Sequence, residues 1–247
     1  MNNRDKIDFI TSWIAEYVGN MPNPAKSLVV GVSGGIDSSL TSTLCCLTGL
    51  NTIAISMPIK TSSNNLNLGE IHGKWLERKF ENASHMTIDL TPTYNEFNSA
   101  LLSSNQDSDL GFANSKSRLR MVTLYQAAAA QNGIVVGTGN KVEDFGVGFY
   151  TKYGDGGVDI SPIADLMKSE VKSLADMLEI DKRIIEAQPT DGLWDDDRTD
   201  ESQLGLSYDE LEDAMQNYSS KNKDKYDQIR KANLHKMEPI PVCKIPK

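Results

Sequence analysis

The feature that most restricts the fold of this chain is a glycine turn between an apolar run and a helical pattern. Residues 28–32 (Leu-Val-Val-Gly-Val) predict a buried strand. Ser33-Gly34-Gly35 interrupts that run, and apolar residues at helical spacing resume at Ile36. Adjacent glycines let a ligand approach the backbone closely, and the first amides of a helix lack intrahelical partners. The stretch therefore predicts a strand, a tight turn and a helix whose start can hold a phosphate.

Polar side chains surround the predicted phosphate position. The hydroxyls of Ser33, Ser38 and Ser39 can donate to phosphate oxygens. Asp37 places a carboxylate among them, which would repel phosphate unless a magnesium ion lay between the two. We therefore expect Asp37 to be a metal ligand. The spacing lacks the lysine of the GxxxxGK[ST] motif, which excludes the nucleoside triphosphatase loop of that kind.

Strands and helices alternate along the first part of the chain without hairpin signals. Further strands are expected at 52–57, 85–89 and 134–137, and helices at 7–18, 68–80, from 91, and at 116–131, with a connecting loop at 105–110. This order predicts the α/β class, a doubly wound parallel sheet that binds ligands at the carboxyl ends of its strands. An irregular functional loop is expected at 139–157, followed by C-terminal helices near 168–178, 181–187, 207–218 and 224–236.

Length, charge and cysteine content limit the function classes. A chain of 247 residues suits a single domain, 1–247, and a net charge of −9 without a basic cluster disfavours a nucleic-acid partner. The polar N-terminus and the lack of a long apolar run predict neither a signal peptide nor a membrane partner. Cys45, Cys46 and Cys243 show no C-x-x-C spacing, so reduced thiols and a cytoplasmic location are expected.

Residues in three further stretches, 114–120, 137–143 and 148–159, are expected to lie near the glycine turn. Glu143 is a candidate second carboxylate for magnesium, and Thr138 a neutral donor to phosphate. Four cations are candidates for neutralising a leaving phosphate group: Lys116, Arg118, Arg120 and Lys168. Each of these signals is weak alone, because most lysines and arginines lie on solvated surfaces.

Taken together, the motifs resemble those of known enzymes. Residues 33–38 (SGGIDS) resemble the SGGxDS motif of the PP-loop ATP pyrophosphatase superfamily, which cleaves ATP between its α- and β-phosphates. Residues 151–159 (TKYGDGGVD) resemble the TKYGDGGxD signature of ammonia-dependent NAD synthetases. Residues 114–120, 137–143 and 204–209 are similar to the NxKxRxR, GTxxxxE and LGxSYD segments of that family. The resemblance covers about residues 7–236.

This resemblance implies an ATP-dependent amidation of deamido-NAD by ammonia, through an adenylate, on a PP-loop fold with magnesium. It assigns catalysis to Asp37, Lys168 and Arg118, and the metal to Asp37 and Glu143. The implied ATP contacts are Gly31, Val32, Ser33, Gly34, Gly35, Ile36, Asp37, Ser38, Ser39, Met57, Thr138, Lys168 and Thr190. The implied deamido-NAD contacts are Arg118, Phe149, Lys152, Asp155, Asp159, His235 and Lys236.

The resemblance also implies a homodimer, in which Ile10, Trp13, Ile14 and Tyr17 of the first helix could take part. The alternative is that this face packs on its own domain. Family members that use glutamine carry an amidase domain, for which this chain leaves no room, so glutamine is not expected to replace ammonia. The acidic segment 189–204 is expected to be a mobile lid, with an ordinary surface loop as the alternative.

The sequence also has two alternative interpretations. Another PP-loop ligase is one alternative: residues 152–159 disfavour a GMP-synthetase-like ATPase, and low basic charge and the missing C-x-x-C disfavour a tRNA-modifying thiolase. A non-catalytic adenine-nucleotide sensor would not need the carboxylates and cations described above. The chain departs from many family members at 139–141, at Gln203 and after Met57, which leaves the adenine contacts the least defined.

Overall fold

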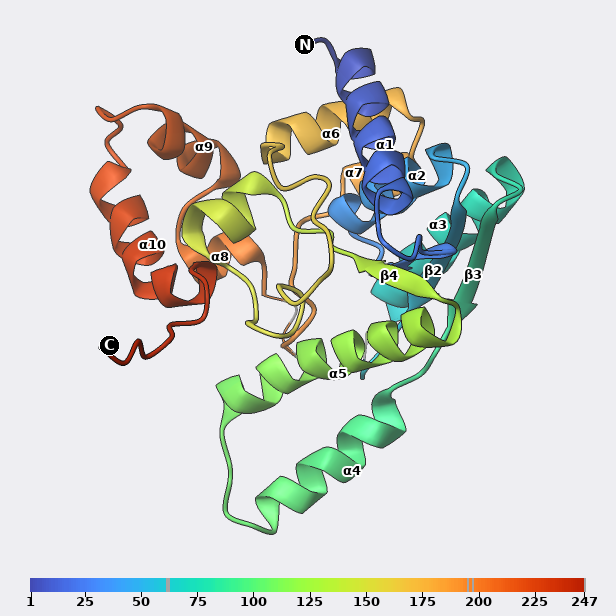
Figure 1. The fold of residues 1–247 in the computed structure, drawn as a ribbon. Coiled ribbons are helices and arrows are strands. Elements are labelled where there is room, and N and C mark those ends of the chain that lie inside the picture. The colour runs from blue at the N-terminus through green and yellow to red at the C-terminus, as the bar shows by residue number, and fades with distance from the viewer. Residues whose placement is uncertain (61–62, 195, 197, 247) are drawn as a thin grey trace.

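The computed structural model describes residues 1–60, 63–194, 196 and 198–246. Within these residues the centre of the fold is a parallel sheet in the strand order β3-β2-β1-β4 (Figure 1). Its strands are β1 (Ser27–Gly31), β2 (Asn51–Ser56), β3 (Ala83–Thr87) and β4 (Gly133–Val136). The predicted parallel α/β sheet is therefore confirmed. Strand β3 lies two residues earlier than the predicted 85–89, because Thr52 of β2 pairs with Ala83 and Ser56, the last residue of β2, pairs with Thr87.

The central strands are buried on both faces. In β1, Leu28 and Val30 belong to one hydrophobic cluster, whereas Val29 between them belongs to another on the opposite face. Strand β4 repeats this alternation, with Val135 on the same face as Val29. Near-continuous apolar runs follow from such burial, since side chains of a strand alternate between the faces.

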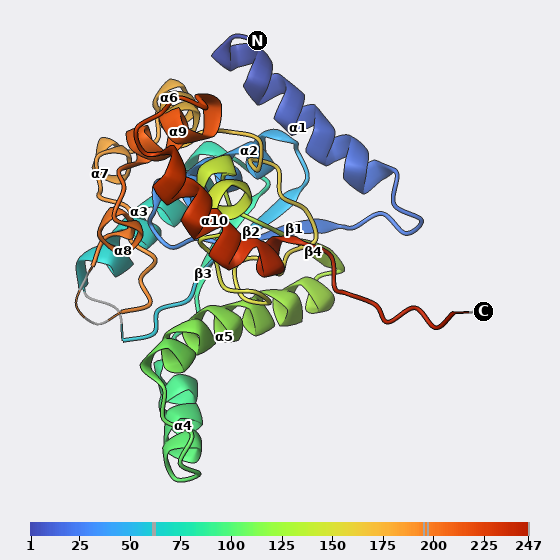
Figure 2. The same cartoon turned by 90° about the vertical axis from the view of Figure 1, so that its left-hand side faces the viewer.

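Helices cover both faces of the sheet (Figures 1 and 2). One face packs against α1 (Asn3–Gly19), α2 (Ile36–Leu47), α3 (Ser63–Lys79), α6 (Lys168–Met177) and α7 (Lys182–Ile185). The other face packs against α4 (Thr91–Leu102) and α5 (Asp109–Ala130). Helix α5 is longer than predicted because the Ser108 side chain accepts a hydrogen bond from Gly111 N and caps the helix within the expected loop.

A separate cluster of helices lies beside the carboxyl end of β4. It contains the π-helix η1 (Lys141–Val147), α8 (Asp200–Leu204), α9 (Tyr208–Gln216) and α10 (Lys223–Met237), which share a hydrophobic cluster (Figure 1). The prediction that 139–157 is irregular throughout is wrong for η1. The Asn140 side chain accepts hydrogen bonds from Val142 N and Glu143 N and so starts this wide helical turn. Such π-turns often occur at functional sites.

Helix α1 packs on its own chain through part of its apolar face. Ile10 and Ile14 are buried in the core, so the prediction that they form a partner surface is wrong. Trp13 and Tyr17 are 38% and 42% exposed. Residues four apart share a helix face, and the buried row therefore lies next to an exposed aromatic row. Among the described helices, none is long and apolar enough to cross a bilayer.

A buried histidine between α2 and α3 predicts a loss of stability in acid. His72 is 1% exposed, its Nε2 lies 3.0 Å from Ser42 Oγ, and its ring stacks on Trp75. Burial lowers the pKa of His72 from 6.5 to about 4. Between these two pH values His72 is protonated in the unfolded chain but neutral in the folded chain. The free energy of unfolding therefore falls as the pH drops from about 6.5 to about 4. The shift corresponds to about 3 kcal/mol.

Urea unfolding between pH 7 and pH 4.5 measures this effect. His72→Gln should lose less stability over that range than the wild-type chain does. His85→Gln is the matched control: burial lowers the pKa of His85 as well, but His85, which lies 3.0 Å from Ser56 Oγ, is only half-buried, so its replacement should reduce the acid loss less. An equal acid loss in wild-type chain and His72→Gln would contradict the prediction.

Candidate active site

The strand order reverses at β1, whose neighbours are β2 on one side and β4 on the other. In open α/β sheets, ligands bind at the carboxyl ends of strands where such a reversal occurs. The glycine turn follows β1 at this position, and η1 follows β4 beside it. Asp37 and Glu143, which are far apart in the sequence, therefore start from neighbouring strand ends.

The turn after β1 is folded back on itself by its own hydroxyl groups. Gly34 has a φ of 92°, a left-handed conformation that favours glycine. Ser38 Oγ lies 3.2 Å from Ser33 Oγ and donates to Gly35 O at 3.0 Å. Gly35 is the N-cap of α2 and has no side chain to satisfy the first amides of the helix, which stay available for an anion. Ser33 is exposed, whereas Ser39 is fully buried beneath the turn.

Lys168 lies between the two predicted metal-binding carboxylates. Its Nζ is 2.5 Å from Asp37 Oδ2 and 2.9 Å from Glu143 Oε1. The three side chains come from α2, η1 and α6, and they are only 11–18% exposed. We call these three residues the charge cluster. Side chains from three distant segments of the chain thus meet at the ammonium group of Lys168.

The surrounding side chains orient the charge cluster. Asn140 Nδ2 donates to Asp37 Oδ1 at 3.0 Å, while its Oδ1 caps η1. Tyr208 donates its hydroxyl proton to Glu143 Oε1 at 2.5 Å, and Asp200 Oδ2 lies 3.2 Å from the same hydroxyl. The ammonium group of Lys168 lies over the Tyr208 ring, 4.8 Å from its centroid. Both carboxylates are therefore held by groups outside the cluster.

The members of the charge cluster shift one another's pKa values. Burial alone would lower the pKa of Lys168, but the charges of Asp37 and Glu143 outweigh it and raise that pKa. Burial raises the pKa of Asp37 against the opposing charge of Lys168. Burial acts in the same direction on Glu143, but Lys168 and the Tyr208 hydroxyl together hold its pKa below the ordinary value. Lys168 is therefore cationic and Glu143 ionised at neutral pH.

The charge cluster fits a magnesium ion shared with phosphate. Asp37 and Glu143 already point at one cationic atom, so their oxygens converge where a cation is stabilised. No group of three or more His, Cys, Asp or Glu side chains in the described part of the chain has a metal-binding arrangement. Magnesium commonly takes one or two protein carboxylates and completes its shell with phosphate oxygens and water. Two carboxylates beside an anion-binding turn match that pattern.

The predicted deamido-NAD residues come from α5, from the loop that follows η1 and from the end of α10. Arg118 Nε donates to Lys152 O at 3.2 Å, and Lys152 Nζ donates to His235 O at 3.3 Å. Lys236 Nζ donates to Tyr150 O at 2.9 Å. Helix α10 therefore docks on the loop that follows η1 and brings the two ends of the predicted substrate site together.

Two acidic residues of the same loop contact the protein itself. Asp155 Oδ1 accepts hydrogen bonds from Ser117 Oγ at 2.6 Å and from the backbone of Thr151. Asp159 accepts from Tyr125 and from Val135 N in β4, so it anchors the loop to the sheet. The expected contacts of both carboxylates with deamido-NAD stay predictions.

The remaining predicted contacts lie around the cluster. Phe149 is half-buried, and its backbone N donates to Glu143 O at 2.8 Å. Met57 is 8% exposed, and its carbonyl accepts a hydrogen bond from Arg120 Nε at 3.1 Å. Thr138 follows β4 and, like Thr190, is half-buried. Phe149 therefore contacts the backbone of a charge-cluster residue, whereas Met57 and Thr138 follow β2 and β4, the two neighbours of β1.

The predicted lid, 189–204, has contacts of its own. Asp200 N donates to Pro189 O and closes the base of the segment. Gln203 accepts from Trp194 Nε1 and donates to Asp191 Oδ2, which requires an amide rather than a carboxylate at this position. Leu193 O accepts from Lys116 Nζ. Asp195 and Asp197 lie outside the described residues, and the opening of a lid stays a prediction.

Sequence reasoning missed three residues of the site: Asn140, Asp200 and Tyr208. Asn140 carried a signal, because Asn followed three residues later by Glu is a helix-start pattern. Tyr208 lies within the LGxSYD segment but follows a helix cap, and nothing local shows that its side chain reaches Glu143. Asp200 lies in an acidic segment, and nothing in the sequence distinguishes this buried carboxyl group from its exposed neighbours.

Comparisons with known proteins agree on one family. The model of the NAD synthase family matches residues 6–246. A relative from Mesoplasma florum, described as an NH3-dependent NAD+ synthetase, is 34% identical over 96% of this chain and 95% of its own length. A protein of the same description from Mycoplasmopsis pulmonis is 42% identical over 76% of this chain and 70% of its own length. The solved structure of NMN synthetase from Francisella tularensis has a TM-score of 0.90 and 29% identity, with 99% of this chain and 100% of that chain covered.

Proposed function

This chain belongs to the NAD synthase family, and we infer from that membership that it amidates deamido-NAD with ammonia, using ATP. It is a ligase that forms a C–N bond, as its NH3-dependent relatives are named. A carboxylate does not react readily with ammonia, so the nicotinate must first become an adenylate. The observation that supports this reaction most strongly is the charge cluster beside an anion-binding turn.

The chemistry assigns a task to each part of the site. The nicotinate carboxylate attacks the α-phosphorus of ATP, and pyrophosphate leaves into the turn formed by residues 33–39. Lys168 would neutralise the charge that develops on the leaving group, because its ammonium contacts Asp37 in the first turn of the helix that follows this turn. Ammonia then displaces AMP from the adenylate. Neither step needs a protein nucleophile, so positioning and charge neutralisation carry the catalysis.

Magnesium is part of this proposal, with Asp37 and Glu143 as its protein ligands. When bound, the ion would neutralise phosphate charge and favour departure of pyrophosphate. The two carboxylates would hold it in place, and Asn140 and Tyr208 would keep their oxygens oriented. Arg118 lies at the outer edge of the site, where its contact with Lys152 places it beside the deamido-NAD loop.

We also propose a cytoplasmic protein that works as one domain, 1–247. The C-terminal helices support this arrangement because α10 contacts η1, whose Glu143 belongs to the charge cluster. The thiols of Cys45 and Cys46 are buried, and burial raises the pKa of Cys46 to about 12, so neither is a nucleophile at neutral pH.

An assay of NAD and pyrophosphate formation tests the function. Purified protein with deamido-NAD, ATP, magnesium and ammonium should release one pyrophosphate for each NAD. Glutamine in place of ammonium should give less than about 1% of that rate, because glutamine hydrolysis needs an activated nucleophile, whereas both α2 thiols are buried and Cys243 is exposed beyond the end of α10. The ammonium reaction is the control for active enzyme, and robust synthesis from glutamine would refute the prediction.

A second substrate is favoured by the likeness to NMN synthetase, which has a TM-score of 0.90 over the whole chain. NMN contains the same nicotinamide without the adenylyl half of NAD. Deamido-NAD and nicotinate mononucleotide carry the same nicotinate carboxylate, so the charge cluster could serve the reaction of either one with ATP. Competition between deamido-NAD and nicotinate mononucleotide in one reaction, with both amides quantified by chromatography, gives the ratio of kcat/KM. A ratio above one for the mononucleotide would assign the chain to NMN synthesis.

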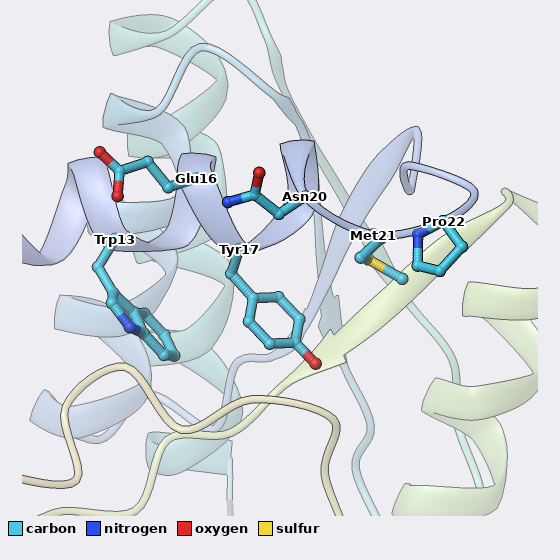
Figure 3. A pocket seen from close by; sticks show the side chains of 6 residues that line it. All are labelled: Trp13, Glu16, Tyr17, Asn20, Met21 and Pro22. Carbon is cyan, nitrogen blue, oxygen red and sulfur yellow. The ribbon is translucent and has the colours of Figure 1, made fainter.

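We propose that the protein is a homodimer that uses the exposed aromatic row of α1. Trp13 and Tyr17 line a shallow pocket that also includes Met21 (Figure 3). Their rings lie 5.8 Å apart, and exposed aromatic groups of this kind are enriched at interfaces. The family resemblance supports a dimer, and this row supports its location.

Light scattering should report a dimer for the wild-type protein. The double variant Trp13→Glu/Tyr17→Glu should shift it to the monomer and leave the unfolding midpoint of the monomer unchanged, because both side chains are already exposed. Leu102→Glu is the control, since Leu102 is an equally apolar residue, 50% exposed, on α4. A wild-type monomer, or a double variant that stays dimeric, would contradict this interface.

A further inference from the structure

Tyr208 contacts two members of the charge cluster with two different parts of its side chain. Its hydroxyl donates to Glu143 Oε1, and the face of its ring lies below the Lys168 ammonium. A ring face attracts a cation, whereas a hydroxyl attracts a carboxylate. One residue that will not touch the reacting atoms therefore holds both a cation and an anion of the site.

The backbone of Tyr208 is fixed where α9 begins. Ser207 and Glu210 form a capping box around it. Tyr208 N donates to the Glu201 side chain at 2.9 Å. The side chain is 8% exposed and packs in the hydrophobic cluster of η1, α9 and α10. Because the helix start and the ring are both immobilised, the hydroxyl has a fixed position relative to Glu143.

Asp200 places a second carboxyl oxygen beside the hydroxyl, farther away than the oxygen of Glu143. Its Oδ2 lies 3.2 Å from the Tyr208 hydroxyl, whose single proton is directed to Glu143 at 2.5 Å. A phenol has one proton to donate and can accept with its lone pairs. Tyr208 is consequently bracketed by two carboxyl groups, one in η1 and one at the start of α8.

We propose that Tyr208 is a positioning residue, which orients Glu143 through its hydroxyl and Lys168 through its ring so that both meet the metal–ATP complex in a fixed arrangement. The proposal rests on the proposed ATP and magnesium site. Hydrogen bonds to metal ligands from outside the coordination shell typically change metal affinity by about 10-fold to 100-fold. Tyr208→Phe removes the hydroxyl and keeps the ring, so it should weaken metal binding without displacing Lys168.

Binding of Mn2+, measured by electron paramagnetic resonance with saturating α,β-methylene-ATP, tests this without turnover. Tyr208→Phe should raise the Mn2+ Kd at least about 10-fold. Its affinity for the nucleotide in EDTA should stay within about twofold of the wild-type value, because the ring still supports Lys168. Tyr208→Leu, which lacks the ring as well, should weaken both.

Tyr226→Phe is the matched control. Tyr226 is a tyrosine of the same hydrophobic cluster, 5% exposed, but it lies in α10 and the cation over its ring is Lys223 instead of Lys168. It should bind Mn2+ and nucleotide as the wild-type chain does. If Tyr208→Phe binds Mn2+ as tightly as Tyr226→Phe, the positioning role is wrong. If the wild-type chain binds neither Mn2+ nor the nucleotide, the proposed function itself fails.

Discussion

Asp37→Asn should lower kcat/KM by at least about 100-fold, because it removes one of the two carboxylates that face the cation of the site. The fold should survive the change. An asparagine Oδ1 can still accept the hydrogen bond from Asn140, and Lys168 keeps Glu143 as a partner. The free energy of unfolding should fall by only about 1–2 kcal/mol.

Steady-state assays with purified protein and urea unfolding at pH 7 measure the two effects separately. Asp165→Asn is the control, because Asp165 pairs with Lys141 on the surface and is 95% exposed. It should leave both quantities unchanged. Turnover of Asp37→Asn close to that of Asp165→Asn would remove Asp37 from the mechanism.

Lys168→Met should differ from Asp37→Asn, because it should lose stability as well as activity. Two carboxylates that are less than one-fifth exposed would face each other without their shared cation. Removal of one partner from a buried ionic group typically costs about 3–5 kcal/mol. Catalysis should also fall by at least about 100-fold, since the leaving pyrophosphate loses its cation.

The unfolding free energy from urea titration at pH 7 decides this case. Lys74→Met is the control, because Lys74 pairs with Glu70 across 3.7 Å on α3 and is 64% exposed. Exposed pairs of this kind contribute about 0–1 kcal/mol. Equal losses in Lys168→Met and Lys74→Met would mean that the charge cluster does not stabilise the fold.

Sequence patterns predicted the part of the site that is formed by residues close together in the chain. The strand, turn and helix at 28–40 could be read from residues that are neighbours in the chain, and the structure has them where expected. Periodicity could not reveal η1, because a π-turn has neither the period of a helix nor that of a strand. Its start depends on one side chain, that of Asn140, which binds two backbone amides.

Contacts between distant segments explain what sequence reasoning missed. That Tyr208 meets Glu143, 65 positions earlier, depends on how α9 packs against η1. On α1, Ile14 and Tyr17 are close in sequence, and both fit the helical spacing of apolar and aromatic residues. Only the packing of α2 and α6 against the helix shows that Ile14 is buried and Tyr17 is exposed.

The order in which the parts of the site occur along the chain has a consequence for synthesis on the ribosome. All strands of the described sheet are complete by Val136, whereas Lys168 and Tyr208 come later, and α10 ends at Met237. A nascent chain can therefore assemble its sheet while Asp37 and Glu143 still lack their cation. Domains fold largely as their residues emerge. Nucleotide binding should thus be acquired late, when the last helices leave the exit tunnel and dock on η1.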